Sequence, residues 1–104
     1  MPSDPGAGIA RDLKSIEWLK TELVAGVAGL FRALWKNAEE SVVERLANLV
    51  ITSYVLGRRL GISHERLDMK IEQTVRANIA NAHELEAWYG DFSAYLNHIE
   101  NKKR

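Results

Sequence analysis

Cysteine is absent from this sequence of 104 residues, which excludes disulfides, thiolate metal sites and thiol catalysis. Excess charge of one sign is absent too: 14 basic residues balance 14 acidic ones, so no net field attracts nucleic acid or an anionic membrane. The longest uncharged runs, 23–31 and 47–57, fall well short of the ~20 residues that a membrane span requires. We therefore expect neither a nucleic acid nor a membrane as a partner.

Proline and glycine are scarce after the amino end. Both prolines and two of the seven glycines lie within residues 1–10, a composition that buries too little apolar surface to fold. We predict a flexible tail over 1–10, one helical domain over 11–100 and a basic end over 101–104. The opening segment MPSDPGAGIARDLK lacks the apolar core of a signal peptide, so we expect a soluble, cytoplasmic protein.

Apolar residues recur every three or four positions, the spacing of amphipathic helices, and no stretch alternates in polarity as a strand would. This periodicity predicts helices over about 13–37, 41–60 and 64–81, with Gly61 suited to a left-handed turn. A further apolar series precedes Gly90, after which Asp91 is the predicted N-cap of a last helix. We therefore expect an all-α bundle of three long helices and a short C-terminal helix.

The first two predicted helices carry apolar residues on more than one face. Val24, Val27 and Phe31 cannot share one narrow stripe with the other apolar positions of the first helix. The simplest way for a small domain to bury extra apolar surface is to pack against a second copy of the chain. The sequence therefore predicts a homodimer, and a tetramer stays open.

Two stripes of residues at helical spacing face each other if the first two helices pack antiparallel. The first stripe is small and the second polar: Glu22, Gly26, Gly29 and Ala33, against Ser41, Arg45, Asn48 and Thr52. An interior glycine costs a helix about 1 kcal/mol relative to alanine, so this pair needs a reason. Two interpretations remain open. In the first, the glycines have a packing role: they permit close approach of the two helices or make room for Arg45. In the second, they mark a former ligand site.

Four separated segments of the chain read IEWLKTELVAGVAGLFRAL, LANLVITSYVLGRRLGIS, LDMKIEQ and HELEAWYGDFS. Together they resemble the MazG-like branch of the MazG family, which comprises all-α nucleoside triphosphate pyrophosphohydrolases. The resemblance implies a dimer of helical bundles. In active MazG enzymes a Glu-x-x-Glu and a Glu-x-x-Asp hold magnesium, which binds the triphosphate and activates water for cleavage between the α and β phosphates.

This chain departs from that metal-binding pattern. Aligned with the family's first block, LVAGVAGL places Gly26 and Gly29 at the two glutamate positions. Aligned with the second block, VERLANLV places Arg45 and Asn48 at the glutamate and aspartate positions. A guanidinium keeps its charge and so opposes a bound cation. We therefore expect no catalytic residue, no metal ligand and no cofactor, with Arg45 filling the former metal position and pairing with Glu22 or Glu44.

Three functions remain open on this basis. The favoured one is a MazG-like dimer without pyrophosphohydrolase activity that senses a nucleotide or binds a protein. The second is an active magnesium-dependent enzyme that uses carboxylates outside the motif, such as Glu22, Glu44 and Asp68. The third is a purely structural dimerisation module. The candidate ligand-binding residues are Glu22, Arg45, Asn48, Trp88 and Tyr89.

Two features near the carboxyl end allow more than one interpretation. Trp88 and Tyr89 could stack on a base, but their helical spacing favours a role as core aromatics. His83 and Glu86, with Asp91 nearby, could bind a metal, but two ligands at a helix end do not define a site. We therefore favour a capping or surface role for His83 and Glu86.

Overall fold

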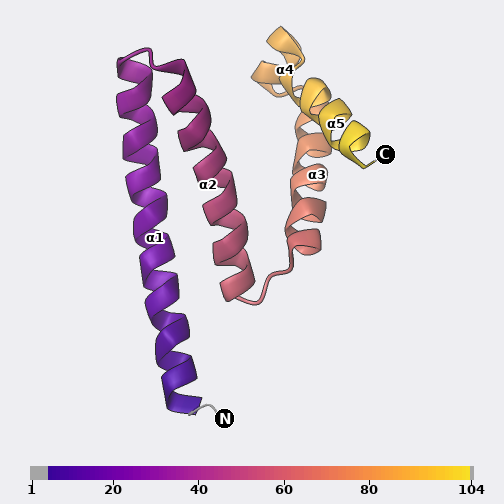
Figure 1. Cartoon of the computed structure of the whole chain (residues 1–104). Coiled ribbons are helices and arrows are strands. Elements are labelled where there is room, and N and C mark those ends of the chain that lie inside the picture. Colours follow the sequence, from indigo (N-terminus) through magenta and orange to yellow (C-terminus); the bar gives the residue numbers. More distant parts are fainter. Residues whose placement is uncertain (1–4, 104) are drawn as a thin grey trace. The chain divides into compact units, whose positions relative to one another are not determined.

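The computed structural model describes residues 5–103, with side chains from residue 8 onward. These residues form five helices and no strand (Figure 1): α1 (Pro5–Trp35), α2 (Glu39–Arg59), α3 (His64–Ala80), α4 (Glu84–Tyr89) and α5 (Asp91–Lys102). The predicted all-α fold class is confirmed. One helix more is present than expected, because Ala82 adopts a left-handed conformation (φ 50°) and separates α4 from α3. The chain divides into two compact units, with the boundary between residues 64 and 65.

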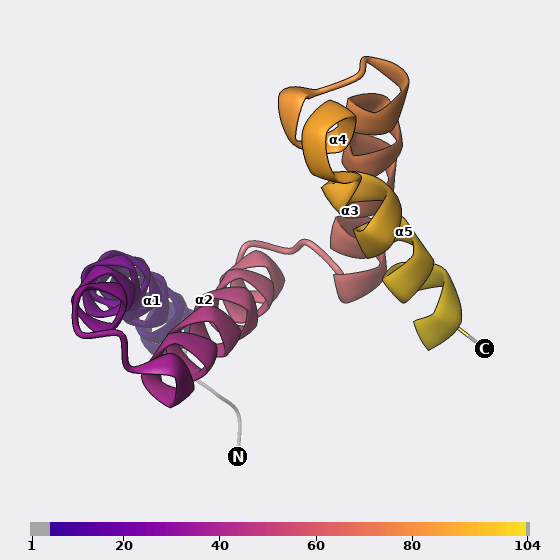
Figure 2. The ribbon, with the colours of Figure 1, turned by 90° about the horizontal axis from the view of Figure 1, so that it is seen from above.

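The first unit is an antiparallel pair, with α1 and α2 lying side by side in both views (Figures 1 and 2). Leu19 and Ala33 of α1 are buried, at 5% and 6% exposed. The turn between the helices uses a left-handed Asn37 (φ 53°), and the Ala38 N–H donates to the Ala33 carbonyl over 3.1 Å. This short turn brings the two predicted stripes face to face.

Helix α1 begins at Pro5, earlier than the apolar periodicity predicts. Proline suits the first helical position because its missing N–H has no partner there. Residues 5–10, which composition assigns to a tail, are thus helical, while residues 1–4 lie outside the described part.

The second unit contains α3, α4 and α5, with Val75 buried at 4% exposed. Charged groups tie the end of α5 to α3: Lys103 Nζ lies 2.7 Å from Glu72 Oε1, and Arg76 Nη2 lies 3.1 Å from Glu100 Oε1. The hydrogen bond from Lys103 is the main cause that lowers the pKa of Glu72 below its ordinary value.

The corner between α4 and α5 turns at Gly90, which is left-handed (φ 67°). The Glu86 carboxylate accepts hydrogen bonds from the Ser93 N–H, over 2.9 Å, and from the Ser93 hydroxyl. These bonds lower the pKa of Glu86, since they favour its charged form. Asp91 is the first residue of α5 rather than its cap, so that prediction is wrong: Glu86 of the preceding helix reaches the free N–H groups instead.

Apolar side chains are mostly uncovered among residues 8–103, where only three hydrophobic residues are buried. The exposed large hydrophobic residues of the first unit are Ile9, Leu13, Trp18, Val24, Val27, Phe31, Leu34, Trp35, Val43, Leu46, Val50, Ile51, Val55 and Leu60. None of the described helices has the length and apolar character to span a membrane. Exposed apolar surface is typical of a face that a partner covers.

Candidate functional site

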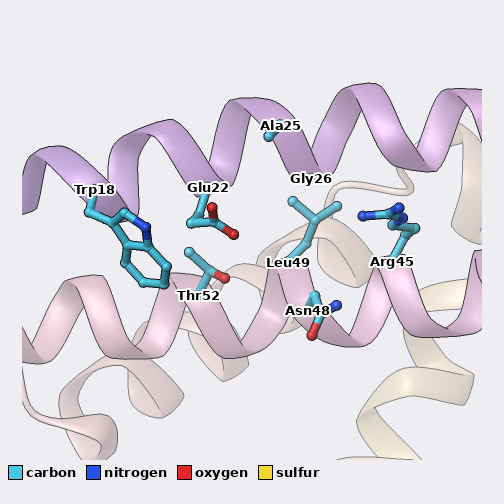
Figure 3. A pocket seen from close by; sticks show the side chains of 8 residues that line it. All are labelled: Trp18, Glu22, Ala25, Gly26, Arg45, Asn48, Leu49 and Thr52. Atoms are coloured by element: carbon cyan, nitrogen blue, oxygen red, sulfur yellow. The ribbon is translucent and has the colours of Figure 1, made fainter.

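A cavity of about 250 Å³ lies between α1 and α2 (Figure 3). Its lining combines members of both predicted stripes with residues beside them: Trp18, Glu22, Ala25, Gly26, Arg45, Asn48, Leu49 and Thr52. Three of the five candidate ligand-binding residues, Glu22, Arg45 and Asn48, are therefore brought together in the first unit.

Gly26 and Gly29 of α1 each make room for a side chain of α2. A Cβ atom added to Gly29 would lie 2.9 Å from both Cζ and Nε of Arg45, closer than van der Waals contact allows. A Cβ atom added to Gly26 would lie 3.0 Å from Cδ2 of Leu49. The guanidinium of Arg45 thus lies directly against the backbone of α1, and the packing explanation of the glycines agrees with this geometry.

Arg45 makes no ion pair with any carboxylate in the described part of the chain, so the predicted pairing with Glu22 or Glu44 is wrong. Glu22 is too far from Arg45 to form an ion pair. Seven residues of helix, about 10 Å, separate Glu22 from the level of Gly29, where the guanidinium lies. Glu44 does not pair with Arg45 because adjacent residues of a helix point about 100° apart. Two opposite charges therefore line one cavity without neutralising each other.

The lining residues do not fit the magnesium that the family resemblance implies. Magnesium prefers several hard oxygen ligands in an octahedron, usually with carboxylates among them. Glu22 is the single carboxylate in this lining, and Arg45 brings a fixed positive charge. Across the described residues, no group of three or more His, Cys, Asp or Glu side chains is arranged to hold a metal ion.

Trp18, which neither predicted stripe includes, lines the cavity next to Glu22 and is 61% exposed. The signal was present, because Trp18 precedes Glu22 by four residues and Gly26 by eight, so it continues the small stripe by one more turn. An aromatic ring on that stripe offers a flat apolar face to a ligand.

Trp88 and Tyr89 do not line this cavity. They lie on α4 in the second unit, where they are 67% and 71% exposed and contact each other edge to face, with ring centroids 6.3 Å apart. The expectation that they are core aromatics is therefore wrong within this chain. Helical spacing predicted their shared face correctly but could not predict whether another element covers it.

His83 and Glu86 cap helices, as favoured over a metal site. Nδ1 of His83 accepts a hydrogen bond from the Leu85 N–H over 3.1 Å, which makes His83 the N-cap of α4. The His83 ring also contacts Phe92 edge to face, with centroids 5.1 Å apart. The Glu86 carboxylate accepts a hydrogen bond from the Ser93 N–H in the first turn of α5.

Part of the exposed apolar surface, the side that carries Val27 and Val50, lies on the opposite side of the helix pair from the cavity. Gly26 faces α2, and its neighbours Ala25 and Val27 point to opposite flanks because adjacent helical residues are about 100° apart. Likewise Asn48, which lines the cavity, and Val50, which is exposed and apolar, flank Leu49. A partner that covers the side of Val27 and Val50 therefore leaves the cavity open.

These features define a class of protein: an all-α chain whose first two helices line a small, partly open polar cavity. The model of the MazG-like family matches residues 9–92, and the chain belongs to this family. Comparison with curated proteins and with solved structures found no match.

Proposed function

We propose that this MazG-like protein is a homodimer that binds a nucleotide in the cavity between α1 and α2 without hydrolysing it. The observation that supports this most is the position of Arg45, whose guanidinium lies against Gly29 with no carboxylate partner in the described residues. By the family resemblance, both residues stand where metal-binding carboxylates would be.

A guanidinium supports phosphate binding without a metal. It presents several N–H donors in a planar fork that matches two phosphate oxygens. Asn48 and Thr52, which also line the cavity, add an amide and a hydroxyl that can bond further oxygens. Cleavage of the triphosphate would require a metal that activates water, and the lining lacks the carboxylates to hold one.

A calorimetric titration of nucleoside triphosphates, with and without magnesium, tests this function when the same mixtures are assayed for pyrophosphate. We expect binding that does not depend on magnesium and no release of pyrophosphate. Arg45→Glu should abolish binding, because it replaces the cation with an anion. Arg58→Glu makes the same change on α2 outside the cavity and should leave the affinity unchanged.

Magnesium-dependent release of pyrophosphate would contradict this proposal and favour an active enzyme that uses other carboxylates. In that case Glu22→Gln should remove the activity, because Glu22 is the one member of the alternative set that lines the cavity. Binding unaffected by Arg45→Glu would count against the assigned site. If no nucleotide binds or raises the melting temperature, a structural dimerisation module becomes the better explanation.

The homodimer is supported by the apolar side of the helix pair, where Phe31 is 65% exposed. Burying a phenylalanine side chain contributes roughly 1.5–3 kcal/mol, so several such residues supply a strong drive to associate. Sedimentation should show a dimer for the unaltered chain and a monomer for Phe31→Asp. Ile51→Asp places the same charge on an exposed apolar residue three positions from Asn48, on the cavity side, and should leave the dimer intact.

A further inference from the structure

The cavity between α1 and α2 has two chemically different ends (Figure 3). Trp18 and Glu22 lie together at one end, and Arg45 lies at the other. About 10 Å of helix separates Glu22 from the level of the guanidinium, which lies against Gly29. A ligand that contacts both ends must therefore be elongated, with a flat ring and hydrogen-bond donors on one side and an anionic group on the other.

The charges of the lining favour a ligand with few negative charges. Arg45 is the single cation that lines the cavity, and Glu22 is an anion. Neither has an ion-pair partner among the described residues, so both are available to a ligand. A triphosphate would bring several negative charges to one guanidinium, whereas a monophosphate is matched by its bidentate fork. A volume of about 250 Å³ also lies just below the usual range for a ligand pocket, which favours a small ligand.

The end with Trp18 and Glu22 discriminates between bases through the carboxylate. An ionised carboxylate is an acceptor only, and its two oxygens pair best with two adjacent N–H donors. Guanine presents such a pair on its Watson–Crick edge, the ring N1–H and the exocyclic amino group. Adenine and cytosine place a ring-nitrogen acceptor beside their amino group, which the carboxylate repels, and uracil offers one N–H between two carbonyl oxygens. The Trp18 ring supplies a stacking surface one helical turn from Glu22.

We propose that this cavity selects guanine nucleoside monophosphates. The base stacks on Trp18, its Watson–Crick edge donates two hydrogen bonds to Glu22, and the phosphate accepts from Arg45. This assignment rests on the proposed nucleotide binding and adds its base preference and phosphate requirement. No metal takes part, and additional phosphates gain no further cation from the lining.

Metal-free calorimetric titrations with GMP, AMP, CMP, UMP, GTP and guanosine test this assignment on the full chain. We expect GMP to bind about tenfold or more tightly than the other monophosphates, the gain that charge-assisted hydrogen bonds supply. GTP should bind no more tightly than GMP, and guanosine should bind at least about tenfold more weakly, because it lacks the group that Arg45 holds.

Variants at the base end separate recognition of the base from recognition of the phosphate. Glu22→Gln should weaken GMP roughly ten- to hundredfold and remove the preference over AMP, with Glu44→Gln outside the lining as the control. Trp18→Leu should weaken every base by about fivefold or more, while Trp18→Phe restores part of the affinity. Trp35→Leu, at an exposed position outside the lining, should change nothing. Circular dichroism checks that each variant is helical.

The outcomes distinguish this assignment from the proposed function on which it rests. Equal binding of all monophosphates that disappears in Arg45→Glu would overturn guanine selection but leave nucleotide binding intact. GTP binding much tighter than GMP would overturn the monophosphate assignment. Affinities unchanged in Trp18→Leu and Glu22→Gln would remove the base site. The absence of binding by any of these nucleotides would overturn both proposals.

Discussion

The charged groups at the cavity of the first unit differ in their partners from two carboxylates of the second unit. In the second unit, carboxylates are bonded within the fold: Glu72 holds Lys103, and Glu86 holds Ser93. In the first unit, Glu22 and Arg45 line a cavity without an ion-pair partner in the described residues. Groups bonded internally stabilise a fold, whereas groups left unpaired at a cavity stay available to a ligand. The difference supports a binding role for the first unit and a structural role for these carboxylates of the second.

The helices of the first unit are held mainly by packing. The cross-helix ion pair between Arg59 and Asp12 is long, at 3.7 Å, and exposed, so it contributes little. Leu19 and the small residues Gly29 and Ala33 instead form the buried contact face of α1. The first unit should therefore be sensitive to cavities in that face.

The largest expected effect comes from Leu19→Ala. Truncating a buried leucine leaves a cavity and lowers the free energy of unfolding by about 2–5 kcal/mol. In Leu19→Ala, hydrogen exchange should accelerate in α1 and α2 more than in α3–α5. The control variant is Ile51→Ala, at an exposed position, which should change the free energy of unfolding by less than about 0.5 kcal/mol. Equal acceleration in both units would show that they unfold as one body and would remove the basis for comparing them.

A smaller effect is expected from Gly29→Ala, which tests the room that this glycine makes for Arg45. The new methyl would displace the guanidinium, the flexible end of its side chain, so helix propensity should dominate and stabilise by up to about 1 kcal/mol. Metal-free nucleotide affinity should fall about tenfold, because the cation moves. Gly26→Ala makes the same change against Leu49 and should leave the contact of Arg45 with phosphate in place. Equal affinities of the two variants would contradict this role of Gly29.

The smallest effect is expected from acid, and it concerns the second unit. The folded pKa of Glu86 lies below its ordinary value of 4.5, so its stabilising contribution is present above that pH. This contribution is lost as the pH falls through the lowered pKa. Protection of α4 and α5 from hydrogen exchange, corrected for the intrinsic pH dependence of the exchange rate, should fall with acid in the unaltered chain and fall less in Glu86→Gln. Glu84→Gln is the control: it removes the charge of a carboxylate that lies two residues before Glu86 and has no hydrogen-bond or ion-pair partner among the described residues, so it should retain the full acid response. A flattened response in that variant would contradict the role of Glu86.

Local patterns predicted much of the fold and part of the site. Steps of three and four placed Glu22, Arg45 and Asn48 on facing stripes, and the structure brings all three to one cavity. The same reasoning failed for Asp91, because the N–H groups of α5 are reached by Glu86 from the preceding helix. It also missed Trp18, because the stripe was not extended one turn toward the amino end.

The sequence by itself determined the helices and the MazG-like resemblance, because these depend on residue identity and on spacing along the chain. Only the tertiary structure decided what each side chain meets. It placed Arg45 against Gly29 rather than beside Glu22, and it left Trp88 exposed. Helical periodicity specifies the face on which a residue lies, but the contact made by that face depends on which element packs there and at what height.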